Sequence, residues 1–519
     1  MSKVISAQEA ACFVKSGDTV AFNGFGYGFG FPEALAAALG KRFDETGAPE
    51  NLTLFFASGC GDGGKSDFGL DHLTGKGLVK RVIAGHVGLA RKLSARINAG
   101  EIEGYNFPQG VMTHLYRAAA GGKPGVVTHV GLKTFADPRL EGGKMNEATT
   151  KDLVEVVELG GKEQLFYHAQ PIQVAFIRGT RIDEDGNMTL EKEGVFLETL
   201  HIAQAARNSG GIVIAQAEQV VRRGSLNVRD IRVPGILVDY VVKASPEEHR
   251  MNSGVQYDPA YTGEAVVPPA HMEAMPMGIR KVISRRCAME LQRNTVINLG
   301  IGVPEGVAAV ALEEGMHDWT TMTIEAGSIG GVPGSGCNLG GAANVEVLMG
   351  HPNMFDFYDG GGLDIAFLGL AQADAKGNIN VSKFNGRTVG CGGFVNITQN
   401  TKKVVFCGSF TAGKSDIQVS EGKLQILKEG EHQKFVEQVE QVTFSGEYAQ
   451  ETGQEVLYIT ERAVFRMTEK GLMLTEIAPG LHVERDILAH MAFRPLIAEH
   501  LQEMDAAIFW DEPMGLAER

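Results

Sequence analysis

The chain has 519 residues, of which 44% are hydrophobic and 21% charged, and its formal net charge is −15. This length exceeds what one hydrophobic core usually accommodates, so we expect at least two domains. The negative charge disfavours non-specific binding to nucleic acid and to anionic membrane surfaces, and no apolar run approaches the roughly 20 residues of a membrane span.

The N-terminal sequence and the cysteines predict a cytoplasmic protein. The first residues, MSKVISAQEAACF, lack the apolar core of a signal peptide. The six cysteines are scattered without a C-x-x-C pair, and the 14 histidines include no H-E-x-x-H. We therefore expect reduced thiols, no disulfide framework and no metal site.

An internal repeat organises the chain, because several blocks of the first half return in the same order in the second. The matched pairs are KVIS at 3–6 and 281–284, DTV at 18–20 and NTV at 294–296, NGFGYGFGFPE at 23–33 and NLGIGVPE at 298–305, and VAFIRGTRIDEDGNMTL at 174–190 and IAFLGLAQADAKGNINV at 365–381. After each Pro-Glu pair an Ala-rich segment predicts a helix, since proline is favoured in the first turn and an acid there complements the helix dipole. Matched blocks in a common order indicate a duplicated unit rather than chance similarity.

The repeat predicts an α/β protein with two similar, doubly wound parallel sheets, fused in one chain and related by a pseudo-two-fold axis. We place the halves at residues 1–245 and 279–519. The stretch 246–278 is rich in Pro, acids and small residues and is interpreted as a linker. A ligand site built by both halves is expected. From Arg485 onward the sequence predicts helix.

One acid distinguishes the second copy from the first. Residues 322–324 predict the end of a buried strand, and Glu325 follows, ahead of a run of glycines. Ligands bind at the carboxyl ends of strands in open α/β sheets, and glycines let the backbone approach a ligand closely. Aligned on the glycine two residues later, the first copy has Ala57 in the place of Glu325. The alternative is an exposed loop acid.

The glycine-rich turn at 23–30 does not fit a dinucleotide-binding loop. From Gly24 and Gly26, the third glycine of G-x-G-x-x-G would fall at Phe29. The sequence also contains no G-x-x-x-x-G-K-[ST] loop and no G-x-S-x-G elbow.

Two other turns are candidates for hydrogen-bond donors. In YNFPQG, residues 105–110, Gln109 stands between a proline and a glycine, a position that projects its amide from a sharp bend. The alternative is a solvated turn glutamine. GCGGF at 390–394 either exposes backbone N–H groups as a nest for an anionic oxygen or is a plain turn.

Two stretches leave structural and functional interpretations open. In DFYDGGGLDIAF, residues 356–367, Phe357 and Tyr358 either line a small apolar pocket or belong to the core. Arg462, in YITERAVF, is either an ion-paired structural residue or a ligand contact.

Taken together, these stretches supply one carboxylate, one side-chain amide, backbone donors and an apolar patch. A carboxylate without a proton-transfer partner can attack an acyl group that is already activated, as in a thioester. Fixed donors would hold the oxyanion that forms. An acyl-CoA hydrolase would use the same acid but admit water. A sugar-phosphate isomerase would need basic residues near Glu325, where the sequence offers none, and a scaffold protein would not need the acid at all.

At these residues the sequence resembles the family I coenzyme A transferases, and among them the acetate/propionate (short-chain acyl) CoA-transferases in a single-chain arrangement. The markers are YNFPQGV, GLKTFADPRLEGGKMN, EAGSIGGVP, DFYDGGGLDIAFLGLA, NVSKF, GCGGF and YITERAVF. The resemblance implies that Glu325 is the nucleophile that becomes a glutamyl-CoA thioester. It also implies that the amide of Gln109 and the N–H of Gly392 stabilise the oxyanion.

The same resemblance implies a ping-pong transfer of CoA between a short-chain acyl-CoA and a short-chain carboxylate. CoA would be a substrate, no cofactor would be permanently bound, and the protein would be a homo-oligomer, a tetramer as in relatives. Contacts with substrate or CoA are expected from Gly330, Gly331, Gly361, Gly362, Phe357 and Tyr358.

Overall fold

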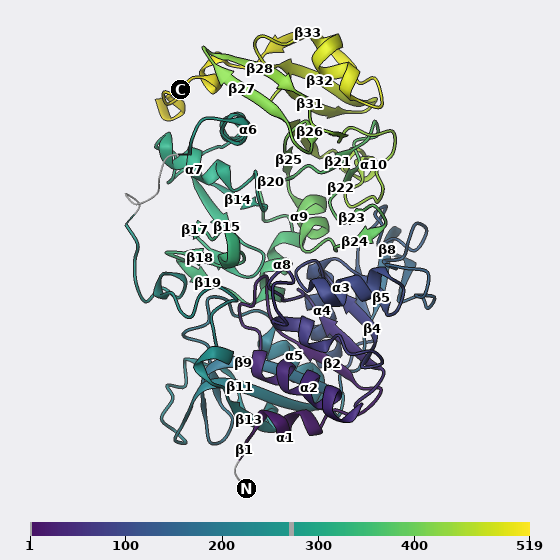
Figure 1. Cartoon of the computed structure of the whole chain (residues 1–519), viewed down its shortest axis with the longest axis vertical. Helices are drawn as coiled ribbons and strands as arrows, with labels where there is room; N and C mark the ends of the chain where they lie inside the picture. Colours follow the sequence, from purple (N-terminus) through teal and green to yellow (C-terminus); the bar gives the residue numbers. More distant parts are fainter. Residues whose placement is uncertain (1–2, 269–274, 519) are drawn as a thin grey trace. The chain divides into compact units, whose positions relative to one another are not determined.

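The structure is a computed structural model that describes residues 3–268 and 275–518 (Figure 1). It divides into two compact units. Unit 1 comprises Met1–Val266, Ile324–Asp356 and Gly386–Asn396, and unit 2 comprises Val267–Thr323, Phe357–Asn385 and Ile397–Arg519. The units differ from the predicted halves, because two segments of the second half pack with the first. Of the predicted linker, residues 246–266 belong to unit 1, and residues 269–274 lie outside the described residues.

Unit 1 is built on a parallel sheet with the strand order β1-β13-β11-β9-β2-β3-β4-β5. These strands are β1 (Val4–Ile5), β2 (Thr19–Phe22), β3 (Leu52–Phe56), β4 (Val79–Ala84), β5 (Glu103–Asn106), β9 (Val174–Asp183), β11 (Ile212–Val221) and β13 (Tyr240–Lys243). The short strands β10 (Met188–Thr189) and β12 (Ile231–Val233) pair beside β9. The central strands β2, β3, β9 and β11 carry runs of consecutive buried residues, as expected of parallel strands that are covered on both faces.

Helices cover both faces of this sheet, because successive side chains of a strand point to opposite faces. Leu54 and Phe56 of β3 pack in one core with Leu35 of the helix α2, whereas Phe55 between them contacts the ring of Tyr116 in α4, with ring centroids 5.0 Å apart. The helices of unit 1 are α1 (Ala7–Cys12), α2 (Glu33–Thr46), α3 (Arg91–Asn98), α4 (Gln109–Ala120) and α5 (Thr199–Asn208). The sheet is therefore doubly wound.

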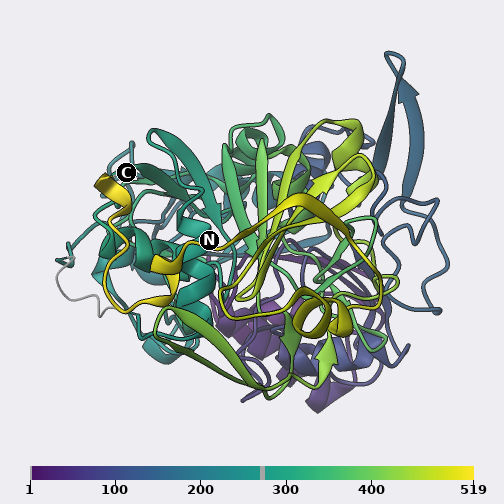
Figure 2. The same ribbon diagram turned by 90° about the horizontal axis from the view of Figure 1, so that it is seen from above.

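The extra length of the first copy, predicted between Gly64 and Val174, adds elements to the sheet and beyond it. It contains β4, α3, β5 and α4, followed by a separate antiparallel sheet of β6 (Gly125–Thr128), β8 (Lys162–His168) and β7 (Val154–Leu159). The β7–β8 hairpin, in blue, projects from the body of unit 1 (Figure 2).

The second half of the chain contributes short strands to unit 1. β16 (Ser328–Ile329) pairs with β19 (Val347–Leu348), and β17 (Val332–Pro333) pairs with β18 (Ala342–Ala343), both antiparallel. β24 (Arg387–Thr388) also belongs here. The helices α8 (His351–Asp359) and α9 (Phe394–Asn400) begin in unit 1 and end in unit 2.

Unit 2 contains a mixed sheet in the order β15-β14-β20-β25-β30-β31-β32-β33, parallel from β15 to β30. The strands are β14 (Thr295–Leu299), β15 (Thr320–Thr323), β20 (Ile365–Gly369), β25 (Lys403–Cys407), β30 (Glu455–Ile459), β31 (Ala463–Thr468), β32 (Gly471–Ile477) and β33 (Leu496–Glu503). Its helices α6 (Ile279–Ala288) and α7 (Gly306–Glu313) pack on this sheet through one apolar core, and α10 (Gly446–Glu451) precedes β30. The remaining short strands are β21 (Gln372–Ala373), β22 (Ile379–Asn380), β23 (Lys383–Phe384), β26 (Thr411–Ala412), β27 (Asp416–Ser420), β28 (Lys423–Lys428) and β29 (His432–Gln433). No helix in the described parts of the chain is long and apolar enough to cross a membrane.

The two sheets share a strand order, which confirms the predicted pair of similar α/β units. The parallel series β13-β11-β9-β2-β3 in unit 1 corresponds to β30-β25-β20-β14-β15 in unit 2. The turn between β9 and β10 and the turn between β21 and β22 also contain the same hydrogen bonds. Asp183 accepts hydrogen bonds from two backbone N–H groups and from the amide of Asn187, and Asp374 accepts the same three from residues 376 and 378.

Strand register places Ala57 and Glu325 at equivalent positions. Pairing across β2 sets Leu54 level with the first residue of β9, and pairing across β14 sets Met322 level with the first residue of β20. Three residues further on lie Ala57 in the first copy and Glu325 in the second. The acid therefore occupies a position where the first copy has only a methyl group.

Three details of the sequence interpretation are wrong. The KVIS match is not structural, because Val4–Ile5 form a strand while residues 281–284 lie inside α6, and a short apolar pair suits either element. The match of 18–20 to 294–296 is displaced by one residue, since β9 and β20 set Val20 level with Ile297. The region after Arg485 is not simply helical, because residues 496–503 form β33 by pairing with β32. Tertiary pairing overrides local propensity there.

Candidate active site

Glu325 lies in a tight turn two residues after β15 ends. The N–H of Ile324 donates to the carbonyl of Ser328 at 2.9 Å, and the N–H of Gly327 donates to the carbonyl of Ile324 at 2.9 Å. The turn requires glycine at 327, where φ is +121° and a Cβ would lie 2.1 Å from the carbonyl oxygen of Met349. These bonds hold a half-buried carboxylate at the carboxyl end of a strand.

Apolar residues on both sides of Glu325 anchor this turn. Ile324 and Ala326 are buried in a hydrophobic cluster with Phe25, Phe29 and Tyr261. The two phenylalanines come from the glycine-rich turn of the first copy, and Tyr261 comes from the predicted linker. The aromatic residues of that turn thus support the acid by packing, because Phe25 and Phe29 are buried.

Gln109 is a buried residue held from two sides, and not a solvated turn glutamine. Only 2% of the surface of Gln109 is exposed. As the first residue of α4, it has a backbone N–H without a partner inside the helix, and this N–H donates to the carbonyl of Gly392 at 2.9 Å. The next N–H, of Gly110, donates to Oδ1 of Asn396 at 3.0 Å. Two segments distant in sequence therefore meet at the start of α4.

The N–H groups of the GCGG turn are occupied inside unit 1. The N–H of Gly392 donates to the carbonyl of Gly85 at 2.8 Å, and that of Cys391 donates to Oδ1 of Asn106 at 3.0 Å. The turn therefore fixes the backbone of 390–392 against the ends of β4 and β5. For Gly392 to serve as an oxyanion donor, its bond to Gly85 must be shared or exchanged, so that role stays a prediction.

His86 follows Gly85 at the same edge of the sheet. Its carbonyl accepts from the N–H of Gly59, and the N–H of the next residue donates to the carbonyl of Val389 at 2.9 Å. Burial lowers the pKa of His86 to about 4. Its imidazole is therefore neutral at physiological pH and adds no positive charge to this edge.

Two residues that the sequence analysis did not single out, Glu198 and His351, complete the arrangement. Both side chains are fully buried, and Oε2 of Glu198 lies 2.7 Å from Nδ1 of His351. On the other side of the ring, Nε2 of His351 lies 2.9 Å from Nε2 of Gln109. The only signal in the sequence is an acid inside the apolar run VFLETL, which is too common a pattern to identify a site.

These contacts connect the three residues that the resemblance singled out. The carbonyl of Gly327, in the Glu325 turn, accepts from the N–H of Met349 at 2.8 Å, two residues before His351. His351 contacts the amide of Gln109, whose backbone binds Gly392. Hydrogen bonds, together with the chain from Met349 to His351, therefore join the Glu325 turn, the amide of Gln109 and the glycine-rich turn within unit 1.

Gly330 and Gly331 have structural reasons to be glycine. Both have φ near +75°, and a Cβ on Gly331 would lie 2.3 Å from the carbonyl oxygen of Ala343. A Cβ on Gly330 would meet the carboxyl of Glu346 at 2.5 Å. These glycines let the β17–β18 hairpin close, and their predicted contact with CoA stays a prediction.

The other four predicted contact residues belong to unit 2. Tyr358 is a core residue, because it is fully buried and its hydroxyl donates to Oγ1 of Thr323 at 2.8 Å. Phe357 is 40% exposed. Gly361 and Gly362 donate to the last carbonyls of α8, and a Cβ on Gly362 would meet the Phe357 ring at 2.2 Å. They form the C-terminal turn of the helix.

Arg462 is a structural residue. Its guanidinium is fully buried and binds Glu461 at 2.8 Å and Glu429 at 2.7 Å. The open alternative of a ligand contact is therefore not supported, since both partners are side chains of unit 2.

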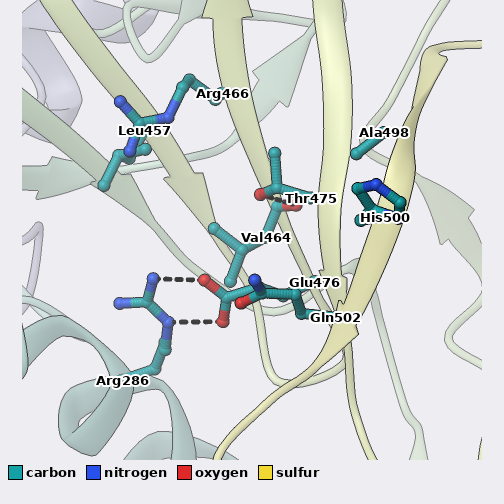
Figure 3. Close-up of a pocket in the computed structure, with 9 residues that line it drawn as sticks. All are labelled: Arg286, Leu457, Val464, Arg466, Thr475, Glu476, Ala498, His500 and Gln502. Atoms are coloured by element: carbon teal, nitrogen blue, oxygen red, sulfur yellow. Dashed lines mark hydrogen bonds and ion pairs between the residues drawn. The ribbon is translucent and has the colours of Figure 1, made fainter.

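Unit 2 contains a cavity of about 260 Å³ whose lining residues include none of the predicted site residues (Figure 3). It is lined by Arg286, Leu457, Val464, Arg466, Thr475, Glu476, Ala498, His500 and Gln502. Its buried cation, Arg286, already makes two bonds to Glu476, at 2.8 and 2.6 Å. The guanidinium is therefore engaged by a carboxylate of the protein.

Comparison with known proteins gives the family. Residues 4–244 match the family model described as coenzyme A transferase. The caffeate CoA-transferase of Acetobacterium woodii is 48% identical, over 99% of each chain. The chain belongs to the coenzyme A transferase family. The acetate CoA-transferase YdiF of Escherichia coli is 40% identical to this CoA-transferase, over 99% of this chain and 96% of that one.

A solved structure agrees with this fold over the whole length. The crystal structure of the acyl-CoA transferase YdiF from Escherichia coli, in a thioester complex with CoA, matches with a TM-score of 0.93 at 40% identity. The match covers 99% of this CoA-transferase and 97% of that chain. The protein is thus an enzyme with the CoA-transferase fold.

Proposed function

We propose that this CoA-transferase exchanges CoA between short-chain acyl-CoA and short-chain carboxylates, acetate and propionate among them, with Glu325 as the nucleophile. The observation that carries the proposal is that hydrogen bonds, together with the chain from Met349 to His351, join the Glu325 turn, Gln109 and Gly392. The thioester complex with CoA described for YdiF supports a covalent route in a relative of this length.

The reaction follows from the chemistry of a carboxylate with an activated acyl group. Glu325 attacks the thioester carbonyl of the donor, the C–S bond breaks, and an acyl-glutamyl anhydride and CoA thiolate form. The thiolate attacks the glutamyl carbonyl of the anhydride, and the donor acid leaves as its carboxylate. The acceptor carboxylate then attacks the glutamyl-CoA thioester, and the same steps in reverse release the new acyl-CoA.

Each attack places negative charge on a carbonyl oxygen, and the amide of Gln109 is the side-chain donor for it. A buried donor that is already oriented costs no reorganisation during the reaction, and removal of such a donor typically costs about 10²–10³ in rate. Water must also be kept from both intermediates, because it would hydrolyse them. CoA enters as a substrate, and the scheme needs no bound cofactor. We further propose a cytoplasmic homo-oligomer.

A second candidate acceptor is caffeate or a related aromatic acid. The 48% identity to a caffeate CoA-transferase over the full length favours it. The two candidates share the Glu325 chemistry and differ in the acceptor. Values of kcat/KM measured with acetyl-CoA and either acetate, propionate or caffeate as acceptor decide between them. A preference for caffeate of tenfold or more would reject the short-chain assignment and keep the mechanism.

The mechanism is tested by Glu325→Gln, which is nearly isosteric and removes the nucleophile. We expect a folded protein whose CoA transfer falls by several orders of magnitude. In the unmodified enzyme incubated with acetyl-CoA, borohydride should trap the thioester on the peptide that contains Glu325, as seen by mass spectrometry. The matched control is Glu346→Gln, which removes an exposed carboxylate 21 residues further on and should keep full activity. Transfer of CoA at the normal rate by the Glu325→Gln variant, once shown to be free of deamidation, would reject Glu325 as the nucleophile.

A further inference from the structure

We propose that Glu198 and His351 are positioning residues that fix which end of the Gln109 amide faces the reacting carbonyl. This inference rests on the proposed function, in which that amide stabilises the oxyanion. It assigns a role to two buried titratable side chains that the chemical steps do not use.

The geometry determines where the protons lie. The amide nitrogen of Gln109 cannot accept a hydrogen bond, so Nε2 of His351, which faces it at 2.9 Å, must be the acceptor and carries a lone pair. The ring proton is then on Nδ1, which donates a hydrogen bond to Oε2 of Glu198 across 2.7 Å. One N–H of the amide therefore binds His351, and the second N–H remains for the substrate oxygen.

This arrangement prevents the amide from turning over. If the Gln109 amide rotated by half a turn, its oxygen would face the lone pair of His351 Nε2 and repel it. The same rotation would exchange the positions of the amide nitrogen and oxygen, and place an acceptor where the developing oxyanion needs a donor. In the present orientation, Oε1 of Gln109 lies on the side of Gly392, 3.5 Å from where a Cβ of that residue would stand.

His351 is held in place by ring contacts, by a backbone hydrogen bond and by the bond of its Nδ1 to Glu198. The rings of Phe25 and Phe355 lie against it, with centroids 5.7 and 5.2 Å away. The N–H of His351 donates to the carbonyl of Leu197 at 3.0 Å, and Leu197 has a φ of +52°, an uncommon conformation for a branched side chain. Such strained backbone is found most often at functional sites, where the surrounding structure holds it in place.

Stability alone gives a poor account of this pair. Oε1 of Glu198 is buried and accepts no hydrogen bond from any residue that the structure describes. An incompletely bonded buried carboxylate costs free energy, because it loses its hydration without gaining a full set of hydrogen bonds. A carboxylate that fixes the tautomer of His351, and through it the donor end of Gln109, explains why this cost is retained.

The experiment is a double-mutant cycle between His351→Phe and Gln109→Ala. The readout is the single-turnover rate of glutamyl-CoA formation from acetyl-CoA, together with KM for acetyl-CoA. We expect Gln109→Ala to lower the rate by about 10²–10³, the usual loss of an oxyanion donor. His351→Phe should lower the rate by about 10- to 100-fold and change KM less than threefold. In the double variant, the His351 effect should disappear to within about threefold, because the histidine acts only through the amide.

A second variant and a matched control keep the test decisive. Glu198→Gln preserves the shape of the pair, should also slow thioester formation, and should lose its effect when combined with Gln109→Ala. The control is His249→Phe, which disrupts another buried Glu–His pair of unit 1, with Glu193 at 3.5 Å. It should lower the thermal midpoint but leave the rate within twofold. The inference would be overturned if the rate losses of His351→Phe and Gln109→Ala multiplied fully in the double variant. It would also be overturned if His351→Phe and Glu198→Gln both formed glutamyl-CoA at the normal rate. A native enzyme that forms no thioester on Glu325 would instead overturn the proposed function, and this inference with it.

Discussion

The replacement Gly327→Ala should move the proposed nucleophile, Glu325, without changing its side chain. Gly327 lies two residues after Glu325, and its added Cβ would stand 2.1 Å from the carbonyl oxygen of Met349. The opposing atom is backbone, and it belongs to the segment that begins α8 two residues later. It cannot rotate away as a flexible side chain would, so the turn or the segment must move as a whole.

The size of the effect follows from these distances. A Cβ needs at least 3.0 Å to a neighbouring atom, so the two backbones must separate by about 0.9 Å. A misplacement of about 1 Å at a reacting group typically costs on the order of 10² in rate. Overpacking of this kind costs about 1–3 kcal/mol of stability, and the φ of +121° adds about 1–2 kcal/mol for a residue with a side chain.

The assay is the rate of glutamyl-CoA formation from acetyl-CoA, measured beside the thermal midpoint. The matched control is Gly336→Ala, because Gly336 also has a positive φ, of +60°, but nothing lies within 4 Å of its Cβ position. It should lose about 1 kcal/mol of stability and keep its rate. If Gly327→Ala forms the thioester as fast as Gly336→Ala, the close approach of Gly327 to Met349 does not position Glu325.

Two further predictions concern stability and use the fluorescence of Trp319 and Trp510, which are the two tryptophans of the chain and both belong to unit 2. Burial lowers the pKa of Lys434 from 10.5 to about 8, which amounts to roughly 3 kcal/mol of lost stability at neutral pH. The loss diminishes as pH rises from 8 to 10.5, because the unfolded state then binds more protons than the folded one. Lys434→Met should therefore raise the urea midpoint at pH 7 and much less at pH 10, whereas an equal shift at both pH values would contradict the pKa assignment. Asp374→Ala leaves three donors of its turn unpaired and should lower the free energy of unfolding by about 2 kcal/mol. The equivalent change Asp183→Ala, in unit 1, should leave the tryptophan transition in place, and a common shift would show that the two units unfold together.

The fold was predictable where the repeat preserves a specific turn. The blocks at 174–190 and 365–381 align without gaps because each needs the same Asp and the same Gly-Asn to close one strand onto the next. The assignment of segments to units was not predictable, since it depends on contacts between residues hundreds of positions apart. Residues 386–396, for example, pack with the first half through bonds to Gly85, Asn106 and Gln109.

The site was predictable only in part, for a physical reason. Glu325 is marked by its strand and by the glycines around it, and Gln109 by its proline and glycine. His351 and Glu198 carry no such local signature, because the role that we propose for them depends on burial and on which ring nitrogen faces which partner. For Gly392 the sequence predicts too much. A glycine-rich turn indicates free N–H donors, but the sequence cannot show that the carbonyl of Gly85 occupies the N–H of Gly392.

The interleaving of the units has a consequence for how the enzyme is made. During translation residues 1–266 leave the ribosome first. They contain the whole parallel sheet of unit 1, but neither the Glu325 turn nor the GCGG turn. Gln109 and Glu198 can form their contacts with His351 and Gly392 only after these residues have been synthesised. The last of the contacts, from Gly110 to Asn396, needs residue 396. A chain that ends before Gly392 would lack the bonds that Gly392 makes to Gly85 and Gln109, and the start of α4 would be held from one side only.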